Sequence, residues 1–238
     1  MNALTDLTSY IGTLIVIIGL HEFGHFIVAK RFGLVASIFS FGFGRILFSR
    51  TDRSGTSWQI RALPLGGFIK LDGSRLTALP PLKRIAIYAA GPTFNIVLGL
   101  VLIAVAGVEF GVPALKSLEI SFKIAPEIIA TMVRSIWNIY TGDISNVSGP
   151  VGSAIASGNA VRLHGIVQFA GLFSWSVGVL NLLPVPLLDG GQIALSGLEM
   201  AIGKLSRTTL RFASYAGMSF IGSLMLAGVA SDIMRLIG

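Results

Sequence analysis

His21, Glu22 and His25 are the residues of this chain whose spacing points most directly to chemistry, because they form the pattern His-Glu-x-x-His. On a helix with about 3.6 residues per turn, His21 and His25 share one face, where two imidazoles can bind one zinc ion. Glu22 then lies beside the metal, where a general base can take a proton from the attacking water. The pattern predicts a zinc-dependent hydrolase. The competing interpretation is a purely structural packing of these three polar residues inside a helix bundle.

A catalytic zinc ion needs a third protein ligand, and the chain contains no cysteine that could supply it. Of the 11 acidic residues, only Glu22 and Asp189 lie in or at the end of a long apolar stretch. Asp189 follows Pro184 and Pro186, which cannot continue an ideal helix. Irregular backbone at membrane depth survives only where protein or a water-filled cavity surrounds it. We therefore expect Asp189 to be the third zinc ligand, in a cavity. The competing interpretation is a helix-end cap or a charge at the membrane interface.

The composition indicates how these residues are positioned. The 238 residues are 53% hydrophobic and only 12% charged, against roughly 25% charged in an ordinary soluble domain. Apolar stretches long enough to cross about 30 Å of hydrocarbon occupy residues 9–29, 85–107, 165–188 and 212–230. The sequence therefore predicts an all-α polytopic membrane protein with four transmembrane helices, the first of which carries the His-Glu-x-x-His motif.

The charged residues predict the orientation in the membrane. Residues 30–84 contain ten Lys or Arg against two acids, and residues 190–211 add three more basic residues. By the positive-inside rule both loops are cytoplasmic and both termini extracytoplasmic. This explains the net charge of +7, so we expect no nucleic-acid partner. Within the extracytoplasmic segment 108–164, residues 114–144 are typical of a pair of amphipathic surface helices.

The first cytoplasmic loop predicts a small membrane-associated β-hairpin within residues 38–71. Residues 43–50 and 56–62 are rich in strand-forming residues, a polar turn separates them, and Pro64 with the glycines after it should end the second strand. One interpretation is an edge strand near the active site, with Ile46 and Leu47 pairing with an extended substrate backbone. The alternative is a hairpin whose basic residues contact anionic membrane lipid.

Several motifs carry a family resemblance. They are His21–His25, the sequence Gly-Pro-Thr-Phe-Asn at 91–95, the segment Asn181–Gly191, the loop segments 41–53 and 63–71, and Ser-Gly-Pro-Val-Gly at 148–152. Together they resemble the site-2 protease family of intramembrane zinc metalloproteases, in its bacterial regulated-proteolysis branch. Members usually carry PDZ domains of about a hundred residues between the second and third spans. The roughly 58 residues here are too few for one, so we expect a single membrane-embedded protease domain over residues 1–238.

The resemblance implies a function and a set of roles. Zinc is the implied cofactor, with no other small-molecule cofactor, and the implied substrates are single-span membrane proteins such as anti-sigma factors or remnant signal peptides. The implied location is the bacterial inner membrane. The roles are metal ligand for His21, His25 and Asp189, general base for Glu22, and substrate contact for Asn181, Pro184 and Pro186.

Two other functions fit parts of the pattern. A membrane-anchored zincin that cleaves soluble segments shares the motif, but it usually takes its third ligand from a Glu on a following helix, and no span here contains one. A divalent-metal transporter could use the same four residues as a transit site. Replacing Glu22 by Gln discriminates, because a transporter should still pass metal whereas a protease should lose turnover and keep zinc.

Overall fold

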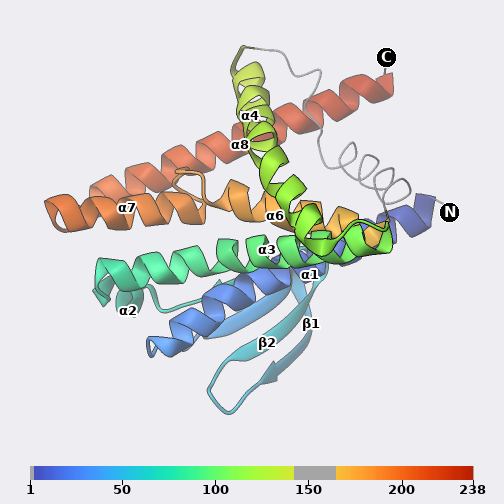
Figure 1. Cartoon of the computed structure of the whole chain (residues 1–238). Coiled ribbons are helices and arrows are strands. Elements are labelled where there is room, and N and C mark those ends of the chain that lie inside the picture. Colours follow the sequence, from blue (N-terminus) through green and yellow to red (C-terminus); the bar gives the residue numbers. More distant parts are fainter. Residues whose placement is uncertain (1–2, 142–164, 238) are drawn as a thin grey trace.

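The computed structural model describes residues 3–141 and 165–237, most of which are helical (Figure 1). The elements in chain order are α1 (Ala3–Arg31), β1 (Ile38–Thr51), β2 (Ser57–Lys70), α2 (Gly73–Ala78), α3 (Pro81–Glu109), α4 (Ala114–Thr141), α6 (Ile166–Asn181), α7 (Asp189–Ile202) and α8 (Arg207–Ile237). The strands lie against α1, and α3 lies between α1 and the α6–α7 segment (Figure 1). The 148–152 motif falls outside the described residues.

Three of the described helices are long and apolar enough to cross a membrane: Ile11–Arg31, Pro81–Glu109 and Thr208–Met234. These agree with the first, second and fourth predicted spans, and the protein is a multi-pass membrane protein. The third predicted span, 165–188, is not confirmed as a spanning helix. Its helix, α6, has 16 residues and ends at Asn181, short of the roughly 20 needed. The chain beyond Asn181 is irregular, as the two prolines predict.

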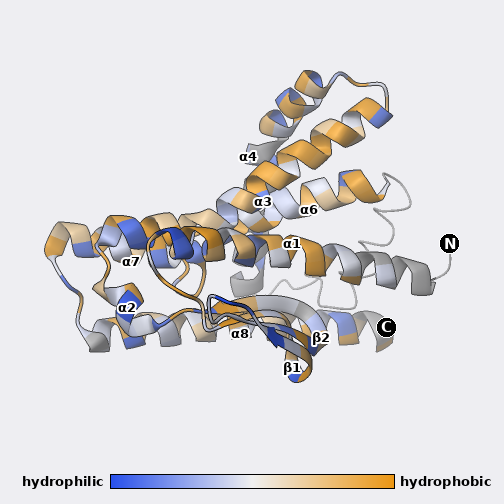
Figure 2. Cartoon of the chain, turned by 90° about the horizontal axis from the view of Figure 1, so that it is seen from below, coloured by the Kyte–Doolittle hydropathy of each residue, from blue (hydrophilic) through white to orange (hydrophobic). Residues whose placement is uncertain are grey.

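Helix α3 has two contrasting faces. Val97, Val101 and Val105 follow one another at four-residue intervals and are 55%, 53% and 46% exposed, so this stripe is suited to lipid. The other face is buried and carries Ile87, Gly91, Asn95 and Gly99, also at four-residue intervals. Figure 2 shows hydrophobic colour along much of α3 and α6. Apolar residues outside and small or polar residues inside are typical of helices packed within a bilayer.

Small residues bring α3 and α6 together. A Cβ on Gly99 of α3 would lie 2.7 Å from the backbone nitrogen of Trp175, and one on Gly178 of α6 would lie 2.8 Å from the carbonyl oxygen of Pro92. Neither distance is possible for real side chains, so both contacts require glycine. This close approach places the end of α6, and the loop after it, beside the buried face of α3.

Strands β1 and β2 form the predicted hairpin, but it is longer than expected and folded over. Thr51 pairs with Ser57 near the turn, and Phe39 pairs with Ile69 far from it. Residues 38–41 also pair in parallel with residues 57–60. The hairpin folds where Gly42 has a positive φ of 88°, a conformation that favours glycine. The prediction that β2 ends near Pro64 was wrong, because β2 runs on to Lys70.

An aromatic cluster fixes the hairpin on α1. Phe26 of α1 and Phe39 of β1 are buried, and their rings meet edge to face at 5.8 Å. The Trp58 ring stacks on Phe39 at 4.6 Å. Such pairs stabilise beyond their buried area by about 0.5–1.5 kcal/mol each. The cluster holds the last residues of β2 against the helix that carries the His-Glu-x-x-His motif.

Helix α4 differs from the prediction. Residues 114–141 form one amphipathic helix rather than a pair, and Pro126 lies within it. The pattern of apolar residues was read correctly, whereas the break between two helices was not. Residues 142–144 of the predicted pair fall outside the described residues.

Candidate metal centre

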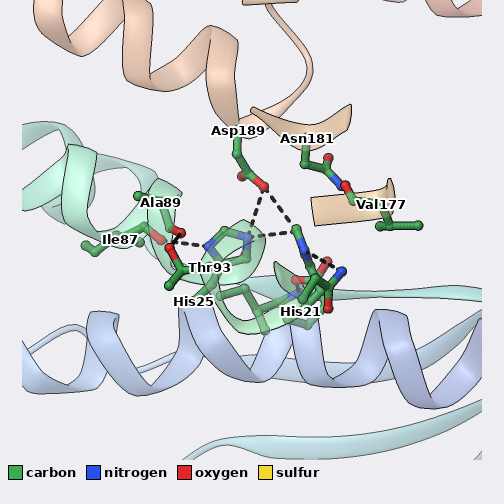
Figure 3. A network of polar contacts seen from close by, with 11 residues as sticks. His21, His25, Ile87, Ala89, Thr93, Val177, Asn181 and Asp189 are labelled. Carbon is green, nitrogen blue, oxygen red and sulfur yellow. Dashed lines mark hydrogen bonds and ion pairs between the residues drawn. The ribbon is translucent and has the colours of Figure 1, made fainter. Parts of the chain in front are cut away.

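Helix α1 and the first residue of α7 bring three ligand atoms together. His21 Nε2 lies 3.0 Å from Asp189 Oδ2, His25 Nε2 lies 3.3 Å from the same oxygen, and the two Nε2 atoms are 3.1 Å apart. Figure 3 shows the Asp189 carboxylate above the two imidazole rings. In the described part of the chain, the ligand atoms of His21, His25 and Asp189 lie close enough together to hold one metal ion.

The donor set fits zinc in type and spacing. Tetrahedral ligands at about 2.0–2.1 Å from zinc lie about 3.3 Å from one another, close to the three separations found here. Gly91 of α3 leaves space at this point, since a Cβ there would lie 2.3 Å from His25 Nε2 and 2.8 Å from His21 Nε2. The Asp189 carboxylate also neutralises one of the two charges of a divalent cation, while the two imidazoles bind as neutral ligands.

Helix α3 holds both imidazoles from behind. The backbone carbonyl oxygen of Ile87 lies 2.7 Å from His25 Nδ1, and the amide nitrogen of Asn95 lies 3.3 Å from His21 Nδ1. Partners on the second ring nitrogen orient metal-binding histidines and set their tautomer. Asn95 thus joins α3 to α1 through a polar contact with His21.

The loop between α6 and α7 positions Asp189. Two glycines follow Asp189, and a Cβ on either Gly190 or Gly191 would lie 2.1 Å from a loop carbonyl oxygen, of Leu182 and Val185 respectively. The loop therefore folds tightly over the start of α7, which glycine alone permits. The Gln192 side chain closes the loop by donating to the Pro186 carbonyl at 2.6 Å. This turn aims the Asp189 carboxylate back toward α1.

A buried ion pair fixes the far part of α7. Arg84 at the start of α3 donates to the Glu199 carboxylate, and their side chains are only 10% and 8% exposed. Glu199 also accepts a hydrogen bond from the backbone N–H of Leu205 at 3.1 Å. The pair joins the two basic loops that the charge pattern places on one side of the membrane.

Glu22 faces a cavity of about 380 Å³ next to the three ligand atoms. Its Oε2 accepts a hydrogen bond from the backbone N–H of Ile69 in β2 at 3.1 Å. The cavity is lined by His21, Glu22, His25, Ile69, Leu71, Leu76, Ile87, Tyr88, Asn181, Leu187 and Asp189. A carboxylate beside the metal ligands, in a cavity with room for water and substrate, can accept and return a proton.

The other predicted site residues are divided. Asn181 lines the cavity and donates to the carbonyl of Val177 in its own helix at 3.0 Å. Pro184 and Pro186 shape the loop but are not among the lining residues.

Ile46 and Leu47 lie outside the cavity lining, with side chains 45% and 65% exposed. The part of the hairpin that reaches the cavity is instead its last stretch, at Ile69 and Leu71. Sequence reasoning missed this stretch, along with Tyr88 and Leu187. The sequence did contain a signal for this stretch. Gly66 and Gly67 lie just before it, and glycine in a strand often marks a place where the backbone approaches another element closely, here α1.

Comparisons with known proteins place the chain in a family. A protein of Campylobacter jejuni whose name describes a zinc metalloprotease is 26% identical over 348 residues, covering 96% of this chain and 94% of the relative. The alignment is longer than this chain, so the relative contains segments without a counterpart here. The regulator of sigma-E protease RseP of Escherichia coli is 37% identical over 163 residues, covering 60% of this chain and 36% of RseP. Residues 9–224 match the profile of peptidase family M50, and the chain therefore belongs to that family, the site-2 proteases.

Proposed function

We propose that this protein is a zinc-dependent intramembrane endopeptidase that cleaves transmembrane segments of other proteins. The observation that carries the proposal is the meeting of His21 Nε2, His25 Nε2 and Asp189 Oδ2 within 3.0–3.3 Å. Glu22 lies next to them, and the two histidines and Glu22 belong to an apolar, membrane-length helix. Ionisable residues within a span are rare unless they serve a function. The family membership and the relatives named as zinc metalloproteases support the same conclusion.

His21, His25 and Asp189 would hold the zinc ion, and Gly91 would leave room for it. When bound, zinc would supply a Lewis acid that polarises the scissile carbonyl and acidifies the attacking water. Glu22 would accept the proton of that water and return it to the leaving amine. Asn181, which lines the same cavity, would bind the substrate backbone beside the reacting carbonyl.

Substrate would have to reach the cavity in an extended form. A helix shields its carbonyls with its own hydrogen bonds, and opening them in hydrocarbon costs several kcal/mol per unsatisfied group. We propose that residues 67–71 of the hairpin receive the opened segment by strand pairing, in place of Ile46 and Leu47. Support comes from Ile69 and Leu71, which line the cavity.

The substrates would be single-span membrane proteins, such as anti-sigma factors or remnant signal peptides. The relatives named regulator of sigma-E protease support this class. The proposed location is the bacterial inner membrane, with α6 and the following loop completing a fourth crossing. The basic loops 30–84 and 190–211 would then face the cytoplasm. The Arg84–Glu199 contact, which joins these loops, supports placing them on one side.

Zinc analysis combined with a cleavage assay tests the proposal. Purified protein should contain one zinc ion, and it should cut a synthetic transmembrane peptide but not a soluble peptide with a loop-like sequence. Glu22→Gln should keep the zinc and lose about 10²–10⁴-fold in turnover, because it removes only the proton transfer. His21→Ala, His25→Ala and Asp189→Ala should each lose stoichiometric zinc.

The alternatives give different results. Transport of metal into vesicles by Glu22→Gln, without peptide cleavage by the wild type, would indicate a transporter. Faster cleavage of the soluble peptide would indicate a membrane-anchored zincin. Full zinc occupancy in Asp189→Ala would overturn the ligand assignment.

A further inference from the structure

Asn95 is buried in α3 with an unusual polar arrangement. Its side chain is 0% exposed, its Nδ2 lies 3.3 Å from His21 Nδ1, and its Oδ1 has no hydrogen-bond partner among residues 3–141 and 165–237. An amide oxygen left unpaired inside a protein destabilises the fold. This cost implies that the Asn95 amide has a role at this position that offsets it.

The orientation of the amide depends on which nitrogen of His21 carries the proton. A neutral imidazole has one N–H donor and one bare acceptor nitrogen. With the proton on Nε2, directed at Asp189 Oδ2 at 3.0 Å, Nδ1 is an acceptor and suits the N–H of Asn95. With Nε2 engaged by a metal, the proton is on Nδ1, and that N–H requires an acceptor instead.

The two ends of an amide have nearly the same shape, so a half-turn of the Asn95 side chain exchanges donor for acceptor without repacking. The half-turn brings Oδ1 to the Nδ1–H of His21 and moves Nδ2 to the position that Oδ1 leaves. We propose that Asn95 is a positioning residue for the metal, which accepts this hydrogen bond and so holds His21 in its metal-binding tautomer and orientation. The inference rests on the proposed function, because it assumes that His21 binds zinc through Nε2.

His25 provides an internal comparison. Its Nδ1 lies 2.7 Å from the backbone carbonyl oxygen of Ile87, which can only accept. The tautomer of His25 is thus fixed by a backbone atom, whereas that of His21 depends on a side chain that can be replaced. Both partners belong to α3, and Gly91 lies midway between them.

Ser174 offers a matched control. It is also 0% exposed, and its Oγ donates to the backbone carbonyl of Asn95 at 2.9 Å. Ser174→Ala therefore removes a buried hydrogen bond at the same point of the α3–α6 contact without touching His21. Any general loosening of this contact should appear in both variants, whereas a loss specific to His21 should appear only at position 95.

Zinc affinity, measured by competition with a chromogenic chelator, tests the inference without relying on activity. Asn95→Leu, similar in size but without an acceptor, should bind zinc about 10–100-fold more weakly than the wild type. Asn95→Asp, which can only accept, should bind within a few-fold of the wild type or more tightly. Ser174→Ala should bind as the wild type does. Cobalt substitution should give the wild-type visible spectrum in Asn95→Asp and an altered one in Asn95→Leu.

Wild-type zinc affinity in a folded Asn95→Leu variant would overturn the inference. If Asn95→Leu does not fold, Asn95→Asp provides the test. Wild-type zinc affinity and a wild-type cobalt spectrum in Asn95→Asp would support the inference, and a tenfold loss of its zinc affinity would overturn it. His21→Ala separates this result from the proposed function. Retention of zinc by His21→Ala would overturn the ligand assignment itself, whereas its loss together with wild-type affinity in Asn95→Leu would overturn the role of Asn95 alone.

Discussion

The carboxylate of Glu22 accepts a hydrogen bond from the backbone N–H of Ile69 at 3.1 Å, although the two residues are 47 positions apart in the chain. Glu22 belongs to the membrane-length helix α1, and Ile69 belongs to the last residues of the hairpin. The bond ties the proposed general base to the strand edge proposed to receive substrate. Catalysis and substrate pairing should therefore respond together to changes at this edge.

Ile69→Pro should lower turnover without removing zinc. Proline has no N–H, so Glu22 loses its partner and the edge loses a donor. We expect at least about a tenfold fall in turnover, since a general base contributes about 10²–10⁴-fold and depends on its position. Cleavage of a transmembrane peptide and zinc content of the same preparation provide the measurement.

Ile46→Pro is the matched control for that experiment. Ile46 is also an isoleucine of the hairpin, but its side chain is 45% exposed and lies outside the cavity lining. Its replacement should reduce turnover much less. Equal losses in both variants would mean that the hairpin acts as a whole and that Ile69 has no special position.

Gly91→Ala should abolish stoichiometric zinc binding. The added Cβ would lie 2.3 Å from His25 Nε2, so the imidazole must move and the ligand set is disrupted. Gly12→Ala in α1 is the control, because no atom of the described part of the chain lies within 4 Å of a Cβ there, and alanine favours a helix over glycine. Metal analysis of both variants checks the prediction, and a zinc-loaded Gly91→Ala protein would contradict it.

Removing one partner of the Arg84–Glu199 pair should destabilise the protein strongly. Arg84→Met leaves the Glu199 carboxylate buried and uncompensated, which costs about 3–5 kcal/mol in comparable pairs. The double variant Arg84→Met with Glu199→Met should recover most of that loss. The free energy of unfolding in detergent, measured for both singles and the double, gives the coupling. Additive losses would show that the two side chains stabilise the fold independently.

The turn of the hairpin should loosen in acid. Hydrogen bonds from the Trp58 indole N–H, and then from the Ser54 hydroxyl, hold the pKa of the Asp52 carboxyl below its usual range. A group whose pKa is lowered by folding stabilises the fold above its unfolded pKa of about 3.9, and the contribution is lost as the pH falls through the folded value. The Trp58 indole N–H resonance should therefore be constant at pH 5 and above and shift at lower pH. In Asp52→Asn this acid transition should be absent, and a transition that persists would assign it to another group.

Residues 30–84 should be accessible from the cytoplasm. The chain has no cysteine, so a single cysteine at Ser54, in the hairpin turn, can be labelled without background. An impermeant thiol reagent should label Ser54→Cys in inverted membrane vesicles and not in intact cells. The opposite pattern would overturn the proposed orientation.

The grouping of His21, His25 and Asp189 was largely predictable because its determinants are local or few. The helix period places His21 and His25 on one face whatever surrounds them. Asp189 followed by elimination, since few acids lie near the apolar stretches. The contacts that complete the site join residues far apart in the chain, such as Asn95 with His21 and Arg84 with Glu199. A single sequence contains no signal for such pairings.

The hairpin shows which features of the fold local sequence patterns predict and which they do not. Its turn was predicted correctly from polar residues between two strand-forming runs. Its length was not, because Pro64 and the glycines after it bend the strand rather than end it. The parallel pairing of residues 38–41 with 57–60 depends on this bend, which the alternation of apolar residues does not encode. Helix α4 similarly continues through Pro126 as one helix, where a pair of helices was expected.

The two faces of α3 should experience very different selection during evolution. Substitutions at Val97, Val101 and Val105 exchange one lipid-facing apolar side chain for another, so this stripe should drift freely among related proteins. Gly91, Asn95 and Gly99 each meet another helix or a histidine at close range. The helix should therefore accumulate changes on one side only, with a period of about four residues, and its mutational record should reveal which side faces the proposed zinc site.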